Sequence, residues 1–295
     1  MLRIPFFMCK IGVCNMQRIL GYLRRAVQEF DLIQNGDKIA VGVSGGKDSL
    51  VLLKALHDFQ RFGLYDYSIV GITLDPQFEG IQTDYSPAER FCADLGIEYH
   101  IIRTQIGQIV FDHRKETHPC SLCAKMRRGA LHDNAKALGC NKLALGHHND
   151  DAIETFLMNL FIEGRIGCYA PKSYLSRKDL TLIRPLSFAP ESDIIHASRQ
   201  NIPEIVKSRC PVDGHTSREM MKNFIREQEK LHSGFKTRVF GAMRRANVDG
   251  WGGKTYVRDL SMDNPETNGK PERFHMLEAE IARRLKEGQY ADLGN

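Results

Sequence analysis

Apolar runs of strand length alternate with amphipathic segments along the first two thirds of the chain. The apolar runs cover residues 39–43, 68–74, 98–104 and 142–145. Apolar residues at helical spacing predict a helix over residues 17–30, and further helices are predicted over 50–56, 86–96 and 151–163. Strands that alternate with helices predict an α/β fold with a doubly wound, mostly parallel sheet.

Beyond about Pro185 the pattern becomes helical and predicts a helical C-terminal part. The predicted helices cover residues 191–200, 217–231 and 236–246. Residues 247–269 are rich in Gly, Asp and Asn, which predicts a loose linker, and a last helix is predicted over 272–287. We expect four parts, which are an N-terminal extension (1–15), a sheet domain (16–188), a helical region (189–247) and a linker with a tail (248–295).

A glycine-rich turn joins the first predicted strand to its helix. It reads Ser44, Gly45, Gly46, Lys47, Asp48 and Ser49. The glycines let backbone N–H groups turn inward around an anion, and the helix points its positive end at the same place. Lys47 adds a charge and Ser49 a hydroxyl donor, so the turn fits a pyrophosphate. The Walker pattern is absent, which argues against a kinase or GTPase. The turn therefore predicts an enzyme that splits ATP into AMP and pyrophosphate.

Two more segments follow predicted strands directly. Leu74 and Asp75 end the second strand, and Gly146–Asp151 follows the fourth. Parallel sheets bind ligands at the carboxyl ends of their strands, so these segments and the glycine-rich turn are expected to line one crevice. Leu74, Asp75 and Gly146 are therefore candidate nucleotide contacts.

Asp48 and Asp151 are placed to hold Mg²⁺, which would bridge phosphate oxygens. For Asp48 a second interpretation is an N-cap of the helix, and the two are compatible. His147 and His148 are as well explained by a structural role at the strand end.

Eight cysteines in a chain without an export signal favour a metal protein of the reducing cytosol. Cys120 and Cys123 form a C-x-x-C pair at the start of a basic helix. The helix N-terminus and the cations of the next turn are expected to lower the pKa of both thiols. Two thiolates are too few for a closed zinc site, and Cys210, in a polar loop before a proline, is the third candidate.

The other cysteines have simpler explanations. Cys92 and Cys140 have apolar neighbours and are predicted to lie in the core, Cys9 and Cys14 are predicted to be free thiols, and Cys168 is ambiguous.

Three thiolates can hold a [4Fe–4S] cluster and leave one iron open for a substrate sulfur. Two alternatives are a persulfide relay on Cys120 or Cys123, and zinc with Asp213 or a histidine as fourth ligand.

The stretch from about Met16 to Asn247 resembles the tRNA 2-thiocytidine synthetase family of PP-loop enzymes. The matching pieces are Ser44–Ser49, Cys120–Gly129, Leu145–Asp151, Arg184–Leu186 and Cys210. The resemblance implies an enzyme that adenylates a base carbonyl of tRNA, cytidine C2, and replaces its oxygen with sulfur. It implies ATP, Mg²⁺ and a [4Fe–4S] cluster as cofactors, with Cys120, Cys123 and Cys210 as cluster ligands. One departure is Asp213, which stands where the family has a further cysteine and leaves the target nucleotide open.

The expected partners are a tRNA and a sulfur donor, either sulfide or a cysteine desulfurase, and a homodimer is compatible with this function. The net charge of +5 is a weak indication of RNA binding. Candidate phosphate contacts, which are equally explained as solvated charges, are Arg127, Arg128, Arg165 and Arg184. No apolar run reaches the roughly 18 residues of a membrane span, so we expect no membrane partner. The ATP-using loop and the lack of an export signal predict a cytoplasmic protein.

Two other functions fit the same residues. One is ATP-dependent sulfur transfer to another tRNA base or to a small molecule. The other is a nitrogen-transferring PP-loop ligase whose cysteines hold structural zinc.

Overall fold

The computed structural model describes residues 11–113, 119–207, 209–211 and 217–253. Its centre is a six-stranded sheet in the order β3-β2-β1-β4-β6-β5. All neighbouring strands are parallel except the β5–β6 pair, which is antiparallel. The strands are β1 (Asp37–Gly42), β2 (Tyr67–Asp75), β3 (Glu98–Arg103), β4 (Lys142–Ala144), β5 (Lys172–Leu175) and β6 (Leu180–Ile183).

The predicted doubly wound, mostly parallel sheet is confirmed. The chain runs outward from β1 to β3 and then crosses to the other side of β1 to form β4. The order therefore reverses between β1 and β4, and the carboxyl ends of these two strands flank the place where such sheets bind ligands. The sequence pattern missed the β5–β6 hairpin, because each of its strands has only four residues and lies among charged ones.

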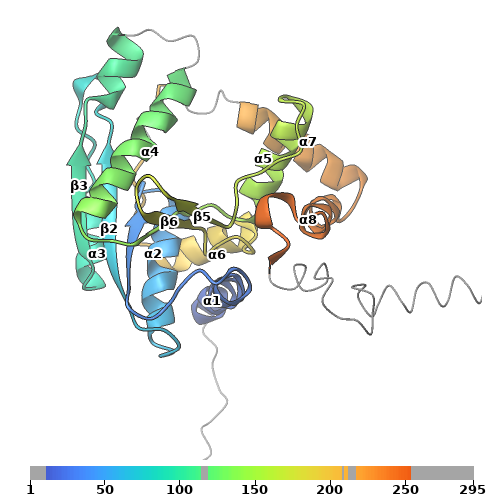
Figure 1. Ribbon diagram of the computed structural model, residues 1–295, viewed down its shortest axis with the longest axis horizontal. Coiled ribbons are helices and arrows are strands. Elements are labelled where there is room, and N and C mark those ends of the chain that lie inside the picture. Colours follow the sequence, from blue (N-terminus) through green and yellow to red (C-terminus); the bar gives the residue numbers. More distant parts are fainter. Residues whose placement is uncertain (1–10, 114–118, 208, 212–216, 254–295) are drawn as a thin grey trace, which may run out of the picture.

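Helices cover both faces of the sheet (Figure 1). The helices are α1 (Ile11–Phe30), α2 (Lys47–Gln60), α3 (Ser86–Asp94), α4 (Pro119–Ala137), α5 (Asn149–Phe161), α6 (Glu191–Asn201), α7 (Ser217–Leu231) and α8 (Phe235–Arg245). Three short helical turns complete the described elements, and they are η1 (Phe78–Gly80), η2 (Gln108–His113) and η3 (Val248–Gly250).

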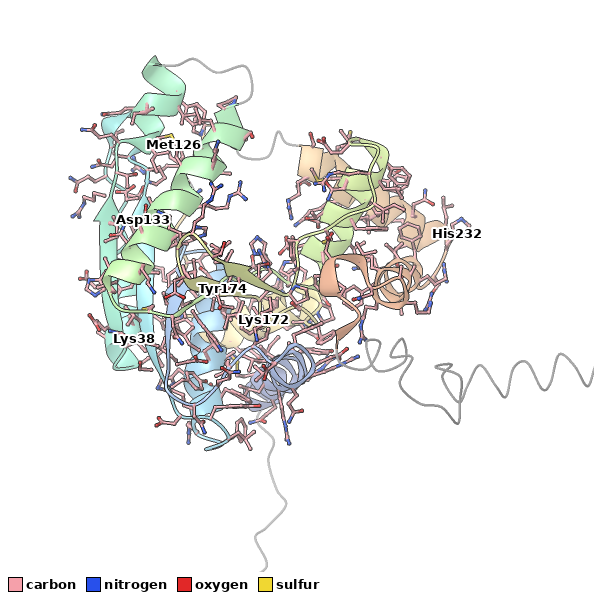
Figure 2. All side chains as sticks on the ribbon, viewed as in Figure 1. Lys38, Met126, Asp133, Lys172, Tyr174 and His232 are labelled. Carbon is pink, nitrogen blue, oxygen red and sulfur yellow. The ribbon has the colours of Figure 1, made fainter. Side chains whose placement is uncertain are left out.

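Successive side chains of each strand point to opposite faces of the sheet, so the interior has two layers. In β1, Ile39 and Val41 join the large core with α1, α2 and α6, whereas Ala40 joins a smaller core with α4. The helices α5, α7 and α8 pack together beside the sheet around Ile153 and Ile225. Their turn at His232 lies at the outer edge of the molecule (Figure 2).

The boundaries predicted between the four parts of the chain differ from those between the packed units of the structure. The helix α6 packs on α1 and α2, so the boundary at residue 188 falls inside the main body. The predicted linker begins too early, because Trp251 is fully buried in the large core and its indole N–H donates to the carbonyl of Tyr169. The helix α1 begins at Ile11, inside the predicted extension. Residues 1–10 and 254–295, with the helix predicted over 272–287, lie outside the described residues.

Of the helices that the structure describes, none combines the length and the apolar character needed to cross a membrane.

Candidate active site

The glycine-rich turn lies where β1 ends and α2 begins, as predicted. The backbone N–H of Ser44 donates to the Ser49 hydroxyl (3.1 Å), which in turn donates to the carbonyl of Gly46 (2.9 Å). Gly46 is the N-cap of α2, and no side chain among the described residues caps this helix start. The first amides of α2 can therefore meet an anion. Asp48 lies inside the helix, so its interpretation as the N-cap is wrong.

Position 45 requires glycine for two reasons, its backbone conformation and the close contact with Val206. The φ of Gly45, +80°, lies in the left-handed region that favours glycine, and a Cβ there would lie 2.6 Å from the Cβ of Val206. The N–H of Val206 donates to the carbonyl of Gly45 (2.9 Å). The segment that leads to Cys210 therefore lies directly against the turn.

Lys47 is held between two carboxylates. Its ammonium lies 3.1 Å from Asp48 and 3.1 Å from Oε1 of Glu191, the first residue of α6. Burial acts to lower the pKa of Lys47, but the two carboxylates outweigh it and raise the pKa above its ordinary value. Oδ1 of Asp48 is buried and accepts no hydrogen bond within the described part of the chain, and it forms the ion pair with Lys47 at 3.1 Å. A cation between the carboxylates of this site would meet that oxygen. Glu191 was not among the predicted site residues.

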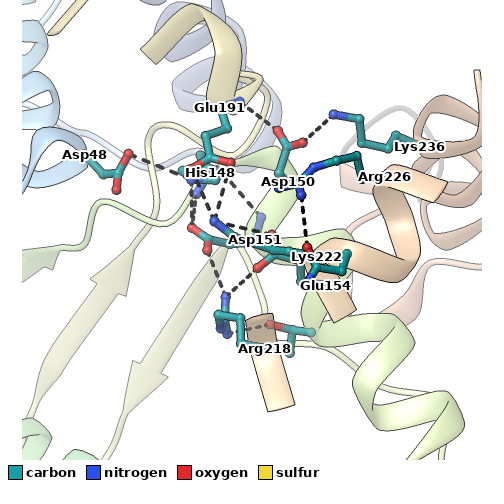
Figure 3. Close-up of polar contacts among 12 residues, drawn as sticks. Asp48, His148, Asp150, Asp151, Glu154, Glu191, Arg218, Lys222, Arg226 and Lys236 are labelled. Atoms are coloured by element: carbon teal, nitrogen blue, oxygen red, sulfur yellow. Dashed lines mark hydrogen bonds and ion pairs between the residues drawn. The ribbon is translucent and has the colours of Figure 1, made fainter. Parts of the chain in front are cut away.

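Asp151 is anchored at the start of α5. Its Oδ2 accepts from the backbone N–H of His148 (3.0 Å), the N-cap residue of α5, and its Oδ1 accepts from Arg218 of α7 (2.8 Å). His148 is buried and its Nε2 lies 3.8 Å from Asp48 (Figure 3). The structural interpretation of His148 is thus correct, and its Nε2 lies near both carboxylates, 3.4 Å from Asp151 and 3.8 Å from Asp48.

His147 takes a different position from its neighbour. Its ring lies against Tyr169, with the centroids 5.0 Å apart, and its Nδ1 is buried with no hydrogen-bond partner among the residues that the structure describes. Burial, and next the charge of Arg184, lower the pKa of His147 to about 4. His147 is therefore a neutral ring at neutral pH.

Asp75 and Gly146 shape the crevice. Asp75 is fully buried and its carboxylate accepts from the backbone N–H groups of Gln77 (3.2 Å) and Thr83 (3.1 Å), so it organises the loop after β2. Leu74 is buried beside it at the end of the strand. A Cβ on Gly146 would lie 3.1 Å from the backbone carbonyl of Asp48. Gly146 thus lets the end of β4 approach the glycine-rich turn.

We expect Gly146→Ala to weaken ATP binding about tenfold and to lower the free energy of unfolding by about 1–3 kcal/mol, the usual range for overpacking. The reason is that the new methyl group displaces the backbone of Asp48. Isothermal titration with ATP and urea unfolding measure the two effects. Gly129→Ala is the matched control, because a Cβ there meets nothing within 4 Å. Equal ATP affinity in both variants would contradict this close approach.

The predicted cysteines come from two distant segments. Cys120 is exposed at the start of α4, and Cys123, one turn later, is buried against Phe78 and Val110. Cys210 packs against the same apolar cluster as Cys123. Burial raises the pKa of Cys123, with Arg127 acting in the opposite direction and the neighbouring Cys210 and Cys120 adding to the rise. The predicted lowering of this pKa is therefore wrong for Cys123, because burial outweighs the cation.

The chemistry of these thiols fits an iron–sulfur group, because thiolates are its usual ligands and the charge of Arg127 favours the thiolate of Cys123. In the described part of the chain, no three side chains of ligand type stand close enough together to form a ready metal site. Asp213 and His118 lie outside the described residues.

The remaining cysteines occupy the positions expected of core residues. Cys92 and Cys140 are buried, which confirms their prediction, and burial raises the pKa of Cys92 to about 12. Cys168 packs on the large core, and its thiol donates to the carbonyl of Ala152 (3.5 Å). Cys9 and the side chain of Cys14 lie outside the described residues.

A cavity of about 240 Å³ connects the glycine-rich turn with the third cysteine. Its lining includes Ser44 and Gly46 from the turn and Val206 and Cys210 from the segment after α6. Its cations are Arg127, Lys207 and Arg209. The nucleotide candidates and a cluster candidate therefore face the same space.

The four candidate RNA contacts differ in exposure. Arg127 lines the cavity, and Arg128 is exposed on α4, where its Nε donates to the carbonyl of Ala124 (3.2 Å). Arg165 is exposed and donates to Asn159 (2.9 Å). Arg184 is buried, donates to the Ala170 carbonyl and lies over the ring of Tyr169. Its placement supports a role in holding the Tyr169 and His147 pair.

The fold agrees with what comparison with known proteins finds. A family model described as a PP-loop domain matches residues 19–228. The chain belongs to the PP-loop family. Relatives named tRNA-cytidine(32) 2-sulfurtransferase include one from Geobacter sulfurreducens, which is 37% identical over 249 residues, 83% of this chain and 94% of the relative. Another, from Geotalea daltonii, is 40% identical over 235 residues, 79% of this chain and 92% of the relative.

A solved structure adds the same indication. The U34-tRNA thiolase NcsA from Methanococcus maripaludis with its [4Fe–4S] cluster matches with a TM-score of 0.65 and 27% identity, over 80% of this chain and 79% of that one. These relatives confirm the predicted resemblance and the PP-loop fold. The glycine-rich turn is from here on called the PP-loop.

Proposed function

We propose that this PP-loop protein is an ATP-dependent tRNA sulfurtransferase that replaces the C2 oxygen of a cytidine with sulfur. The observation that carries the proposal is the cavity lined by both the PP-loop and Cys210, because the reaction needs a phosphate site and a sulfur site side by side. The names of the relatives favour cytidine 32 as the target and sulfur transfer over nitrogen transfer.

Activation by ATP explains the composition of the PP-loop. A base carbonyl is a poor electrophile because oxide is a bad leaving group. In the proposed first step the carbonyl oxygen attacks the α-phosphorus, the bond to the β-phosphate breaks and pyrophosphate leaves. Lys47 and the amides at the start of α2 would hold the leaving phosphates and offset their charge.

The oxygen then leaves as AMP when a sulfur nucleophile attacks the activated carbon. Asp48 and Asp151 would hold Mg²⁺, which would offset phosphate charge. Oδ1 of Asp48 accepts no hydrogen bond among the described residues, which supports this assignment, although Mg²⁺ would share that oxygen with the Lys47 ammonium. Arg218 would have to release Asp151 for that purpose.

Cys120, Cys123 and Cys210 would hold the [4Fe–4S] cluster, which supplies an iron without a protein ligand for the incoming sulfur. The role of the protein is to bring Cys210 beside Cys123 and to keep the pair against an apolar cluster. The source of the sulfur is sulfide or a cysteine desulfurase, and ATP and tRNA are consistent with the expected cytoplasmic location.

Two measurements test the proposed function. Anaerobically purified protein should contain iron and acid-labile sulfide, which a zinc-containing ligase would lack. Incubation with ATP, sulfide and unmodified tRNA should yield 2-thiocytidine, AMP and pyrophosphate, detected by mass spectrometry of the nucleosides and by nucleotide chromatography. Protein with an intact cluster that makes no thiolated nucleoside would contradict the proposal.

We expect the double variant Arg127→Glu, Arg128→Glu to bind tRNA at least tenfold more weakly at low salt. Loss of two phosphate contacts should also reduce the slope of log affinity against log salt by about 1.5–2. Filter binding at several salt concentrations measures both quantities. The matched control, Lys38→Glu with Arg61→Glu, reverses two charges at the opposite end of the sheet from the PP-loop. Equal binding by both double variants would mean that Arg127 and Arg128 are ordinary surface charges.

A further inference from the structure

The carboxylate of Glu191 is held by two lysines from distant parts of the chain. Its Oε1 lies 3.1 Å from the ammonium of Lys47 in the PP-loop and 3.3 Å from that of Lys222 in α7 (Figure 3). Oε2 of the same carboxylate lies 3.5 Å from Lys222. One anionic oxygen therefore joins the PP-loop lysine to a second lysine.

All three groups carry their charge at neutral pH. Burial acts to raise the pKa of Glu191, but Lys47 and Lys222 outweigh it and lower the pKa to about 2. Burial acts to lower the pKa of Lys222, whereas Glu154 and Glu191 raise it above its ordinary value. The arrangement is an anion between two cations, and a phosphate oxygen in the same place would accept charge-assisted hydrogen bonds from both.

Lys222 is placed by the docking of α7 on α5. Met221 and Ile225 of α7 are buried in the apolar cluster shared with α5. Arg218, one turn before Lys222, donates to Asp151 (2.8 Å) and to the buried Glu154 (3.2 Å). Packing and ion pairs on both sides thus fix this turn of α7 beside the PP-loop.

The side chain of Glu191 can move while its backbone stays. The N–H of Glu191 donates to Asp150 (2.7 Å), whose other oxygen accepts from Lys236 (2.8 Å), so the start of α6 is anchored. A cavity of about 310 Å³ adjoins the carboxylate. Its lining mixes carboxylates with cations, which are Asp150, Glu154 and Glu229 and Lys222, Arg226, Lys230 and Lys236. A displaced carboxylate would find room there and could pair with Arg226.

From this geometry we propose that Lys222 is a second phosphate ligand of the PP-loop and that Glu191 occupies the place of a phosphate oxygen until nucleotide binds. The ligand is the pyrophosphate portion of ATP. The inference rests on the proposed use of ATP, and it adds α7 to the nucleotide site. The Lys47 ammonium already lies 3.1 Å from both Asp48 and Glu191, so a phosphate would be a third anion there and would compete with Glu191 for this charge. ATP binding therefore exchanges the carboxylate for phosphate oxygens.

The two halves of this proposal predict effects of opposite sign on the affinity for magnesium pyrophosphate. Lys222→Ala should weaken binding roughly 10- to 100-fold, the usual worth of a charge-assisted hydrogen bond. Glu191→Gln removes the competing charge and should strengthen binding several-fold. Lys136→Ala, an exposed lysine of α4 that pairs with Asp179 (2.8 Å) and lines neither of the two cavities, is the matched control and should bind like the unmodified protein. Adenosine, which lacks phosphates, should bind all four proteins equally.

Isothermal titration with pyrophosphate, ATP and adenosine distinguishes the outcomes. Unchanged pyrophosphate affinity in Lys222→Ala would overturn the assignment of Lys222. Weaker binding by Glu191→Gln would mean that Glu191 positions Lys47, which overturns the exchange. Lys222→Gln, which keeps a hydrogen-bond donor, replaces Lys222→Ala if thermal unfolding shows that the alanine variant is not folded. A failure of the unmodified protein to bind ATP or pyrophosphate would instead contradict the proposed function itself.

Discussion

The Cys210→Ala variant is expected to lose the visible charge-transfer absorption of the cluster and the thiolation activity together. Two thiolates cannot hold a cubane cluster, and Cys210 is the cysteine that the fold brings to the apolar cluster around Cys123. We expect iron content to fall to background and 2-thiocytidine formation to fall at least 100-fold. Absorption spectra, iron analysis and nucleoside mass spectrometry of anaerobically purified protein measure these effects.

Cys140→Ala is the matched control for this prediction. Cys140 is buried against Ala135 and Leu143, away from the apolar cluster of Cys123, so its variant should keep both the spectrum and the activity. A Cys210→Ala protein with full iron content would refute the three-cysteine site. The third ligand would then have to be sought at Asp213, because Cys168 already packs on the large core and donates to Ala152.

Lys47→Ala and Asp48→Ala should each abolish thiolation while the cluster spectrum stays unchanged. The PP-loop and the cysteines come from separate segments, so the phosphate site can fail without loss of iron. Removal of one preorganised charge from such a site commonly costs about 10²–10³-fold in rate, which is the smallest effect that we expect here. Release of AMP and pyrophosphate should fall in parallel with thiolated product.

The control for the PP-loop variants is Lys54→Ala, in the same helix α2. Lys54 pairs with Asp58 (2.8 Å) along the helix and lies two turns beyond Lys47. It should keep full activity. Normal product formation by Lys47→Ala or Asp48→Ala would contradict the assignment of the PP-loop to ATP.

Local patterns in the sequence were sufficient for much of the fold. Four of the five mutually parallel strands, β1 to β4, are found within two residues of their predicted ends, and the predicted helix 217–231 matches α7. These elements are set by the period of apolar residues, which every short window of sequence carries. The PP-loop and the C-x-x-C pair are also local, because their function depends on residues next to one another and on a helix start.

The remainder of the site depends on residues that are distant in sequence. Lys47 and Glu191 are 144 positions apart, and nothing in either neighbourhood indicates the other. The same holds for the contact of Val206 with Gly45. Trp251 lies in a Gly- and Asp-rich stretch that predicted a linker, but its side chain is fully buried in the core. The raised pKa of Cys123 was missed because burial, unlike the charge of Arg127, cannot be read from neighbouring residues.

The sequence by itself thus determined the sheet, the PP-loop and the chemical types of the site residues. Only the tertiary structure decided which of these residues share a cavity and which carboxylate, Glu191, holds Lys47. It also decided that a second lysine, Lys222 of α7, pairs with the same carboxylate. The physical reason is that periodicity and turn chemistry act between close neighbours in the chain, whereas burial, ion pairing and pKa depend on the packing of distant segments.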